Sequence, residues 1–139
     1  MVITNQSGIA RGFFDEDFVG QVHAEMARLL RKEGAALDGF YFCPHHPTEG
    51  IGKYRQVCLC RKPAPGLLRQ AAVELDIDLT RSFMIGDMPK DVEAGKRAGA
   101  KGILVRTGYG VTVEPGSLAP DYIATDLLDA VRWIVAGAP

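Results

Sequence analysis

The chain has 139 residues, of which 47% are hydrophobic and 24% charged, and its formal net charge is −1. These values are typical of one folded globular domain and argue against intrinsic disorder. The balance of 16 Lys+Arg against 17 Asp+Glu argues against a basic, phosphate-driven nucleic-acid surface. No apolar run approaches the roughly 18 residues of a membrane span, and the first residues lack the pattern of a signal peptide. We therefore expect a cytoplasmic protein with a single domain over residues 1–139, which binds neither nucleic acid nor membranes.

Strand-like and helix-like segments alternate along the chain, a pattern typical of an α/β fold with a parallel sheet. Apolar strands are predicted at residues 2–3, 39–43, 82–85, 102–105 and 122–124. Helices are predicted between these strands and after the last one, starting near residues 15, 65, 89 and 127. Asp15 suits the N-cap of the first helix, and Gly34 suits its end. In such a sheet, ligands bind at the carboxyl ends of the strands.

The first predicted helix has apolar residues at helical spacing, at Phe18, Val22, Met26 and Leu29. His23 lies among polar neighbours in the sequence. We therefore place His23 on the polar side of this helix and assign it no role.

Three cysteines and a histidine form a C-x-H…C-x-C pattern within a loop over about residues 43–60. Cys43, His45, Cys58 and Cys60 would supply three sulfurs and one imidazole nitrogen, a complete tetrahedral set for structural Zn²⁺. The loop between the two pairs has no apolar core of its own, so a metal would order it. His46 is the alternative to His45 as a ligand. The alternative to a zinc site is a set of buried thiols beside a surface histidine.

Polar residues also follow the first and third predicted strands. Residues 4–8, Thr-Asn-Gln-Ser-Gly, offer a hydroxyl, amides and backbone N–H groups that suit an anion, although an ordinary polar turn has the same composition. Asp87 and Asp91 are a carboxylate pair that suits Mg²⁺, with a simple helix cap as the alternative role of Asp87. Arg61 and Lys62 directly follow the proposed zinc ligands, where they would bind a phosphate or remain a solvated basic pair.

Residues 4–12, 43–47, 58–63 and 86–91 together resemble the haloacid dehalogenase superfamily. Within it, the chain most resembles the D-glycero-D-manno-heptose 1,7-bisphosphate phosphatases, and the histidinol-phosphate phosphatases come second. The resemblance implies a Rossmann-like three-layer fold with a parallel sheet. It also implies Mg²⁺-dependent hydrolysis of a small phosphorylated substrate, a sugar bisphosphate in the first case. Met88 stands where the heptose-bisphosphate enzymes usually carry Lys.

The resemblance also implies a role for each motif residue. Thr4 would hold the phosphoryl group, and Lys62 would offset its charge. Asp87 would bind Mg²⁺, with Asp91 supporting it. The residues implied in substrate binding are Asn5, Gln6, Ser7 and Arg61.

The nucleophile and the general acid of this superfamily belong to a D-x-D-x-[TV] motif at the end of a central strand, upstream of the segment that matches residues 4–8. One residue precedes Val2 here. We therefore expect a sheet without that strand, negligible phosphatase activity of these 139 residues, and sheet edges that favour self-association. A non-catalytic, zinc-stabilised phosphate-binding module is the alternative function. The literal D-x-D-x-T match at residues 76–80 follows a predicted helix, so we do not expect it to be catalytic.

Overall fold

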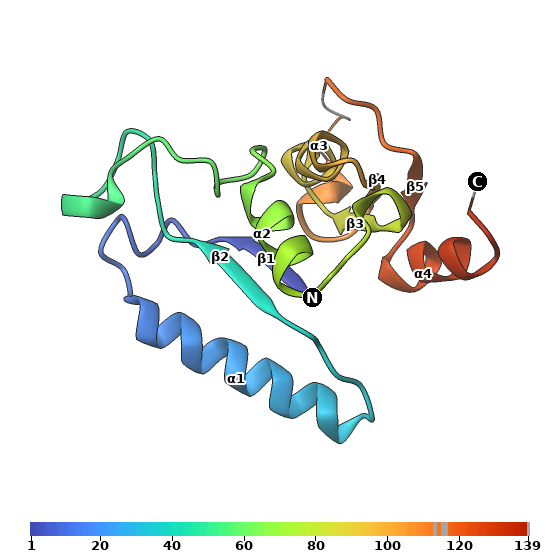
Figure 1. Ribbon diagram of the computed structural model, residues 1–139, viewed down its shortest axis with the longest axis horizontal. Helices are drawn as coiled ribbons and strands as arrows, with labels where there is room; N and C mark the ends of the chain where they lie inside the picture. The colour runs from blue at the N-terminus through green and yellow to red at the C-terminus, as the bar shows by residue number, and fades with distance from the viewer. Residues whose placement is uncertain (113, 115–116, 139) are drawn as a thin grey trace. The chain divides into compact units, whose positions relative to one another are not determined.

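The computed structural model describes residues 1–112, 114 and 117–138, and its chain divides into two compact units, Met1–Arg61 and Lys62–Pro139. Strands and helices alternate along the chain (Figure 1), and the strand pairs are parallel, which confirms the α/β class. None of the helices in the described part of the chain is long and apolar enough to cross a membrane. The strands are β1 (Val2–Asn5), β2 (Phe40–Cys43), β3 (Phe83–Gly86), β4 (Lys101–Val105) and β5 (Tyr122–Ala124). The α-helices are α1 (Glu16–Lys32), α2 (Gly66–Glu74), α3 (Pro89–Ala98) and α4 (Leu127–Val135).

The first unit consists of a two-stranded parallel sheet and the long helix α1, which connects its strands and runs alongside them (Figure 1). The register pairs Asn5 with Cys43, so both strands end at the same level. Asp15 caps α1 as the sequence predicts, because its side chain accepts a 2.8 Å hydrogen bond from the backbone N–H of Phe18. The crossover therefore brings the two polar strand ends together.

The face of α1 that packs inward differs from the predicted one. Val19 and His23 are its buried residues, with 4% and 9% of their surfaces exposed, whereas Phe18 is 50% and Val22 45% exposed. The imidazole of His23 stacks on the ring of Phe40 in β2, with the ring centroids 4.8 Å apart. Placing His23 on the polar side was therefore wrong. Residues 19 and 23 are one helical turn apart and lie on the side of α1 that faces the aromatic residues of β2. The more apolar side of the helix, which includes Phe18 and Val22, does not face this strand.

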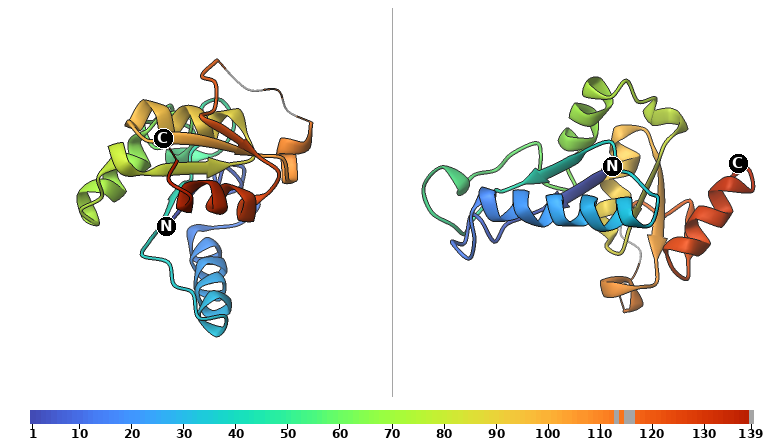
Figure 2. Two further views of the ribbon diagram at one scale, coloured as in Figure 1. Left: turned by 90° about the vertical axis from the view of Figure 1, so that its right-hand side faces the viewer. Right: turned by 90° about the horizontal axis from the view of Figure 1, so that it is seen from below.

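The second unit is a three-layer arrangement around the parallel sheet β3–β4–β5, with α3 and α4 on opposite faces (Figure 2). Alternate residues of a strand point to opposite faces. Ile103 and Val105 of β4 accordingly belong to the apolar cluster that includes Ala130 of α4. On the other face, Gly102 leaves space for Val92 of α3, because a Cβ atom at residue 102 would lie 2.7 Å from the Val92 side chain. The sheet is thus buried on both sides, as parallel sheets require.

Candidate functional site

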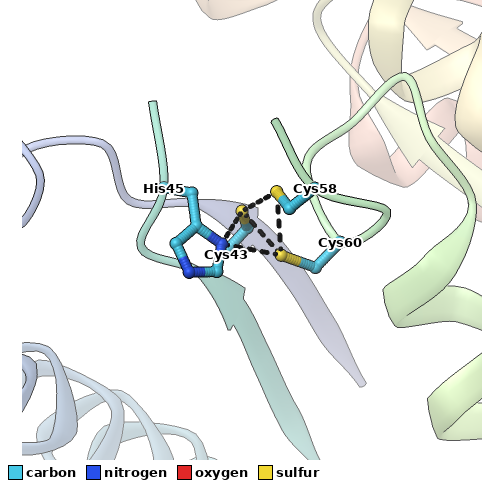
Figure 3. Close-up of side chains that lie close together, drawn as sticks. All are labelled: Cys43, His45, Cys58 and Cys60. Carbon is cyan, nitrogen blue, oxygen red and sulfur yellow. Dashed lines mark hydrogen bonds between the residues drawn. The ribbon is translucent and has the colours of Figure 1, made fainter. Parts of the chain in front are cut away.

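Four side chains of the kinds that can bind a metal ion meet at the carboxyl end of β2 in the first unit (Figure 3). The sulfurs and the His45 ring point toward one another, and all four candidate ligand atoms lie within 4.8 Å of one another. Sγ of Cys60 is 2.9 Å from Sγ of Cys43 and 3.2 Å from Sγ of Cys58, and Nδ1 of His45 is 3.3 Å from Sγ of Cys60. Cys43 is fully buried. The chain thus brings together all four residues that the C-x-H…C-x-C pattern selects.

This cluster fits a tetrahedral Zn²⁺ ion in both chemistry and spacing. Ligand atoms about 2.0–2.3 Å from one tetrahedral ion lie about 3.3–3.8 Å from each other. Apart from the pair of His45 and Cys58, the atoms of the cluster lie 2.9–3.7 Å from one another, close to the spacing that such an ion requires. His46 points elsewhere, since its Nδ1 accepts a 2.9 Å hydrogen bond from the backbone N–H of Glu49. Of the two histidines in the loop, His45 is therefore the one that faces the sulfurs.

The pKa values of the three thiols shift in different directions, although the thiols lie side by side. Burial raises the pKa of the Cys43 thiol, and burial together with the neighbouring thiols raises the pKa of Cys60. Burial also acts to raise the pKa of Cys58, but the hydrogen bonds from Cys60 and Cys43 outweigh it and lower that pKa. In the cluster as it stands, Cys58 is thus the thiol that ionises first. A bound cation would favour the thiolate form of all three.

Residues near the cluster in the first unit offer groups suited to an anion. Thr4 lies near the end of β1, and its Oγ1 accepts a 3.1 Å hydrogen bond from the amide of Gln6. A hydroxyl that accepts one hydrogen bond still has its own O–H to donate, for example to a phosphate oxygen. The backbone N–H of Gln6 donates to the carbonyl of Cys43 at 2.8 Å, which ties this turn to the end of β2. Asn5 ends β1, and Ser7 lies in the turn that follows.

Arg61 is held by the same loop that forms the cysteine cluster. One of its guanidinium nitrogens donates a 3.1 Å hydrogen bond to the backbone carbonyl of His45. His45 therefore has two roles, because its ring faces the sulfurs while its carbonyl orients Arg61. An arginine fixed in this way loses little further side-chain freedom when it binds an anion.

In the second unit, Asp87 follows β3 and is held by a turn that comes after β4. The backbone N–H of Tyr109 donates a 3.0 Å hydrogen bond to Oδ2 of Asp87. Residue 108 is a glycine with φ +54°, and a Cβ atom there would overlap with Oδ2 of Asp87. Met88, not Asp87, occupies the N-cap position of α3. Asp87 is thus not engaged as the helix cap, and its Oδ1 is the oxygen that could bind a cation.

Asp91 lies in the first turn of α3 and forms an ion pair with Lys62. Its Oδ1 is 2.7 Å from Nζ of Lys62, and its Oδ2 accepts a 3.1 Å hydrogen bond from the backbone N–H of Met88. Gly86 is required beside it, since a Cβ atom at residue 86 would overlap with Asp91. Asp87 and Asp91, which the sequence pairs as metal ligands, therefore have different partners.

The D-x-D-x-T match at residues 76–80 follows α2 and runs into a short 3₁₀ turn over Leu79–Arg81, and it does not lie at the end of a strand. Asp78 caps that turn by accepting hydrogen bonds from the N–H and the hydroxyl of Thr80. Asp76 has a positive φ of 52°, as at the end of a helix. Asp76 and Asp78 therefore have local structural roles in the chain between α2 and β3.

Sequence reasoning missed the turn that holds Asp87. Gly108 and Tyr109 lie after β4, and nothing in their composition links them to an aspartate 22 residues away. The glycines at 108 and 110 were the feature of the sequence that could have indicated this turn. At both positions a side chain would collide with its surroundings. Such glycines beyond a strand's carboxyl end mark a close approach of backbone to a site.

Three comparisons with known proteins give consistent results. The HAD-hydrolase-like family model matches residues 59–130, just over half of the chain. The chain is 48% identical over 135 residues to the D-glycero-beta-D-manno-heptose-1,7-bisphosphate 7-phosphatase of Pasteurella multocida, covering 96% of this chain and 72% of that protein. It is 45% identical over 138 residues to the enzyme of the same name from Yersinia pestis, covering 98% and 72%.

Solved structures point the same way. The D,D-heptose 1.7-bisphosphate phosphatase of B. bronchiseptica, solved with magnesium and phosphate, matches with a TM-score of 0.81 and 33% identity. That match covers 99% of this chain and 74% of the other. A putative HAD-like phosphatase from Mesorhizobium loti matches with a TM-score of 0.79 and 36% identity, covering 97% and 64%. The chain therefore belongs to the haloacid dehalogenase-like hydrolases, enzymes that act on phosphate monoesters, and within them to the heptose-bisphosphate phosphatase family.

Proposed function

We propose that the substrate is a heptose 1,7-bisphosphate, that the reaction is hydrolysis of its 7-phosphate, and that the protein uses Mg²⁺ for the reaction and Zn²⁺ for structure. The names of relatives that are 44–48% identical to this chain support the substrate. The hydrogen bond from Arg61 to the carbonyl of His45 is the observation that carries the proposal. It joins a candidate zinc ligand to a cation suited to phosphate recognition.

The role we assign to zinc is to fix the loop that ends in Arg61. The loop between the two ligand pairs contributes exposed side chains, such as those of Ile51 and Val57, and no buried core residue. Four bonds to one ion would replace the missing core of this loop. Arg61 would then keep a fixed orientation toward the substrate at little entropic cost.

The role we assign to Asp87 is to hold Mg²⁺. Mg²⁺ takes one or two carboxylate oxygens together with water and phosphate oxygens, and Asp87 has one oxygen fixed by Tyr109 and a second to offer. When bound, the ion would neutralise charge on the phosphoryl oxygens. Fixing Oδ2 sets the direction in which Oδ1 points, so the carboxylate need not reorganise when the ion arrives.

For the remaining motif residues we propose contacts with the substrate. In the first unit, the Thr4 hydroxyl would donate to the phosphoryl group, and Asn5, Gln6 and Ser7 would line the substrate site. In the second unit, Lys62 would offset phosphoryl charge, as a buried ammonium can do strongly in a site that excludes water. Each role follows from the motif match and suits the donor groups that these side chains carry.

A substrate panel tests the proposal. The native protein is assayed with heptose 1,7-bisphosphate, heptose 1-phosphate, heptose 7-phosphate and histidinol phosphate in the presence of Mg²⁺. In a protein that also carries the D-x-D-x-[TV] strand, we expect kcat/KM for the bisphosphate to exceed that for each other compound by about 10-fold or more, because a second phosphate adds charged contacts. We expect residues 1–139 alone to show negligible turnover. Preference for histidinol phosphate would overturn the substrate. Binding of these esters without hydrolysis would favour the non-catalytic phosphate-binding module, and neither binding nor hydrolysis would contradict both functions.

We also propose that the protein works in the cytoplasm and that it self-associates. Three free cysteines gathered in one cluster favour a reducing compartment. In the described residues, β1 and β3 each lie at an edge of their own sheet, and edge strands are surfaces on which chains pair. Light scattering of the native protein over a range of concentrations measures the self-association directly, and a constant monomer mass would contradict it.

A further inference from the structure

We propose that Asp91 is a positioning residue for Lys62 and not a ligand of the divalent cation. The proposal rests on the proposed function to the extent that Lys62 is the residue that binds the phosphoryl group. It assigns different tasks to the two aspartates that follow β3. Asp87 would hold the cation, and Asp91 would orient the lysine.

The first support is that both carboxylate oxygens of Asp91 have partners. Nζ of Lys62 lies 2.7 Å from Oδ1, and the backbone N–H of Met88 donates to Oδ2 at 3.1 Å. A cation bound at Oδ1 would lie beside the like-charged ammonium of Lys62 and would weaken this ion pair. A cation that took the place of the Met88 N–H at Oδ2 would leave an orphan N–H at the start of α3.

The second support is burial. The side chains of Lys62 and Asp91 are 10% and 6% exposed. Charges this deeply buried persist only when they are paired, so the pair holds the lysine in one place. Gly86 brings the end of β3 directly against Asp91, and no other residue would leave room for the carboxylate. The close approach also limits the directions in which Asp91 can turn.

The third support is that the backbone beside Lys62 is tied to the helix that carries Asp91. The guanidinium of Arg97 in α3 donates a 3.3 Å hydrogen bond to the carbonyl of Pro63. Arg69 of α2 donates a 3.2 Å hydrogen bond to the carbonyl of Arg97. Helix α3 thus fixes both the backbone beside Lys62 and its side chain. An ammonium has three N–H donors, so it can bond to Asp91 and to a phosphoryl oxygen at the same time.

The substitution Asp91→Asn tests the proposal, because it removes the charge and keeps an oxygen for the Met88 N–H. Isothermal titration of the native protein with MgCl₂, and separately with inorganic phosphate, is the readout. We expect the dissociation constant for phosphate to rise about 10-fold, as for the loss of one charge-assisted contact. The dissociation constant for Mg²⁺ should stay within about 2-fold. The matched control Asp87→Asn should show the opposite pattern.

A double-variant cycle separates positioning from an independent role. Lys62→Met should weaken phosphate binding, and adding Asp91→Asn to it should weaken phosphate binding no further, because the residue that Asp91 orients is gone. If the two substitutions raise the phosphate dissociation constant independently, so that their fold-changes multiply in the double variant, the proposal is overturned. It is also overturned if Asp91→Asn raises the Mg²⁺ dissociation constant as much as Asp87→Asn does.

Two further comparisons keep the test decisive. If Asp91→Asn fails to fold, the double variant replaces it, because removing both members of a buried ion pair is tolerated far better than removing one. If the double variant binds Mg²⁺ as tightly as Lys62→Met does, the positioning role of Asp91 is supported. If the double variant binds Mg²⁺ more weakly than Lys62→Met, the proposal is overturned. If the unsubstituted protein binds neither ligand and hydrolyses no phosphate ester, the proposed function itself has failed, which is a different result.

Discussion

The backbone N–H of Tyr109 donates a 3.0 Å hydrogen bond to Oδ2 of Asp87, so a turn after β4 holds the carboxylate that follows β3. The two strands are neighbours in the parallel sheet, with Gly86 opposite Leu104. Adjacent strand ends can therefore share a site, although their residues are far apart in sequence. The close contact depends on Gly108, whose φ of +54° turns the chain toward Asp87.

Replacing Gly108 should therefore weaken cation binding. We expect Gly108→Ala to raise the dissociation constant for Mg²⁺ about 5- to 10-fold, because the added Cβ atom would push against Oδ2 of Asp87. Isothermal titration with MgCl₂ measures the effect. Gly99→Ala is the matched control, since Gly99 also has a positive φ and a Cβ atom there would meet nothing within 4 Å. It should cost about 1–2 kcal/mol of stability and leave Mg²⁺ affinity unchanged.

Removing the charge of Asp87 is the direct test of its role. Asp87→Asn keeps an oxygen for the Tyr109 N–H and loses the anionic ligand that a hard cation requires. We expect the Mg²⁺ dissociation constant to rise more than about 10-fold, with the thermal unfolding temperature little changed. Asp121→Asn serves as the control, because Asp121 binds Lys96 and the Gly102 N–H instead. Equal Mg²⁺ affinity of Asp87→Asn and the unsubstituted protein would rule out Asp87 as the ligand.

The cysteine cluster should hold one zinc ion per chain. We expect elemental analysis of the native protein to find one Zn, and Cys58→Ser to lose it, because a neutral hydroxyl is a far poorer ligand than a thiolate. His46→Gln is the control, since His46 contacts the Glu49 backbone and not the sulfurs. Zinc retained by Cys58→Ser, or lost by His46→Gln, would contradict the proposed set of ligands.

Arg61 should affect substrate recognition and not metal content. Arg61→Lys keeps the positive charge and loses the planar fork that can contact both the His45 carbonyl and a phosphate. We expect KM for the proposed bisphosphate to rise about 10-fold while the zinc content stays at one per chain. Arg55→Lys, at an exposed position of the same loop, should leave KM unchanged. A loss of zinc in Arg61→Lys would show instead that Arg61 supports the fold of the loop.

Local patterns in the sequence predict much of this molecule, for physical reasons that differ from one element to the next. The N-cap at Asp15 and the buried strands can be read locally, because capping and apolar runs depend on neighbouring residues. The cluster of Cys43, His45, Cys58 and Cys60 was predictable because metal chemistry restricts both residue type and spacing. Each of these features is determined mainly by residues that lie close together in the sequence.

Contacts between distant segments could not be predicted in the same way. The backbone N–H of Tyr109 is available at every non-proline residue, so composition does not reveal its bond to Asp87. Asp91 resembled a second metal ligand in sequence, and only the position of Lys62 beside it suggests another role. The inward face of α1 was misjudged because its helical period allows two faces, and the aromatic residues of β2 decide between them.

That inward face places a titratable group in the core of the first unit. Burial lowers the pKa of His23, which stacks on Phe40 and also lies near the ring of Phe42. The folded state therefore favours the neutral imidazole. As the pH falls below the unfolded value of about 6.5, the unfolded chain takes up a proton that the folded chain resists. The free energy of unfolding should decrease as the pH falls through this range.

His23→Phe removes the titration and keeps an aromatic ring against Phe40. We expect the loss of stability between pH 7.5 and pH 5.5, measured by urea unfolding, to be smaller in this variant than in the unsubstituted protein. Any release of zinc on acidification is common to both proteins, so it cancels in the comparison. Gln21→Phe adds the same ring at an exposed position of α1 and should leave the pH dependence unchanged. If His23→Phe loses as much stability as the unsubstituted protein, the imidazole does not contribute to this acid sensitivity.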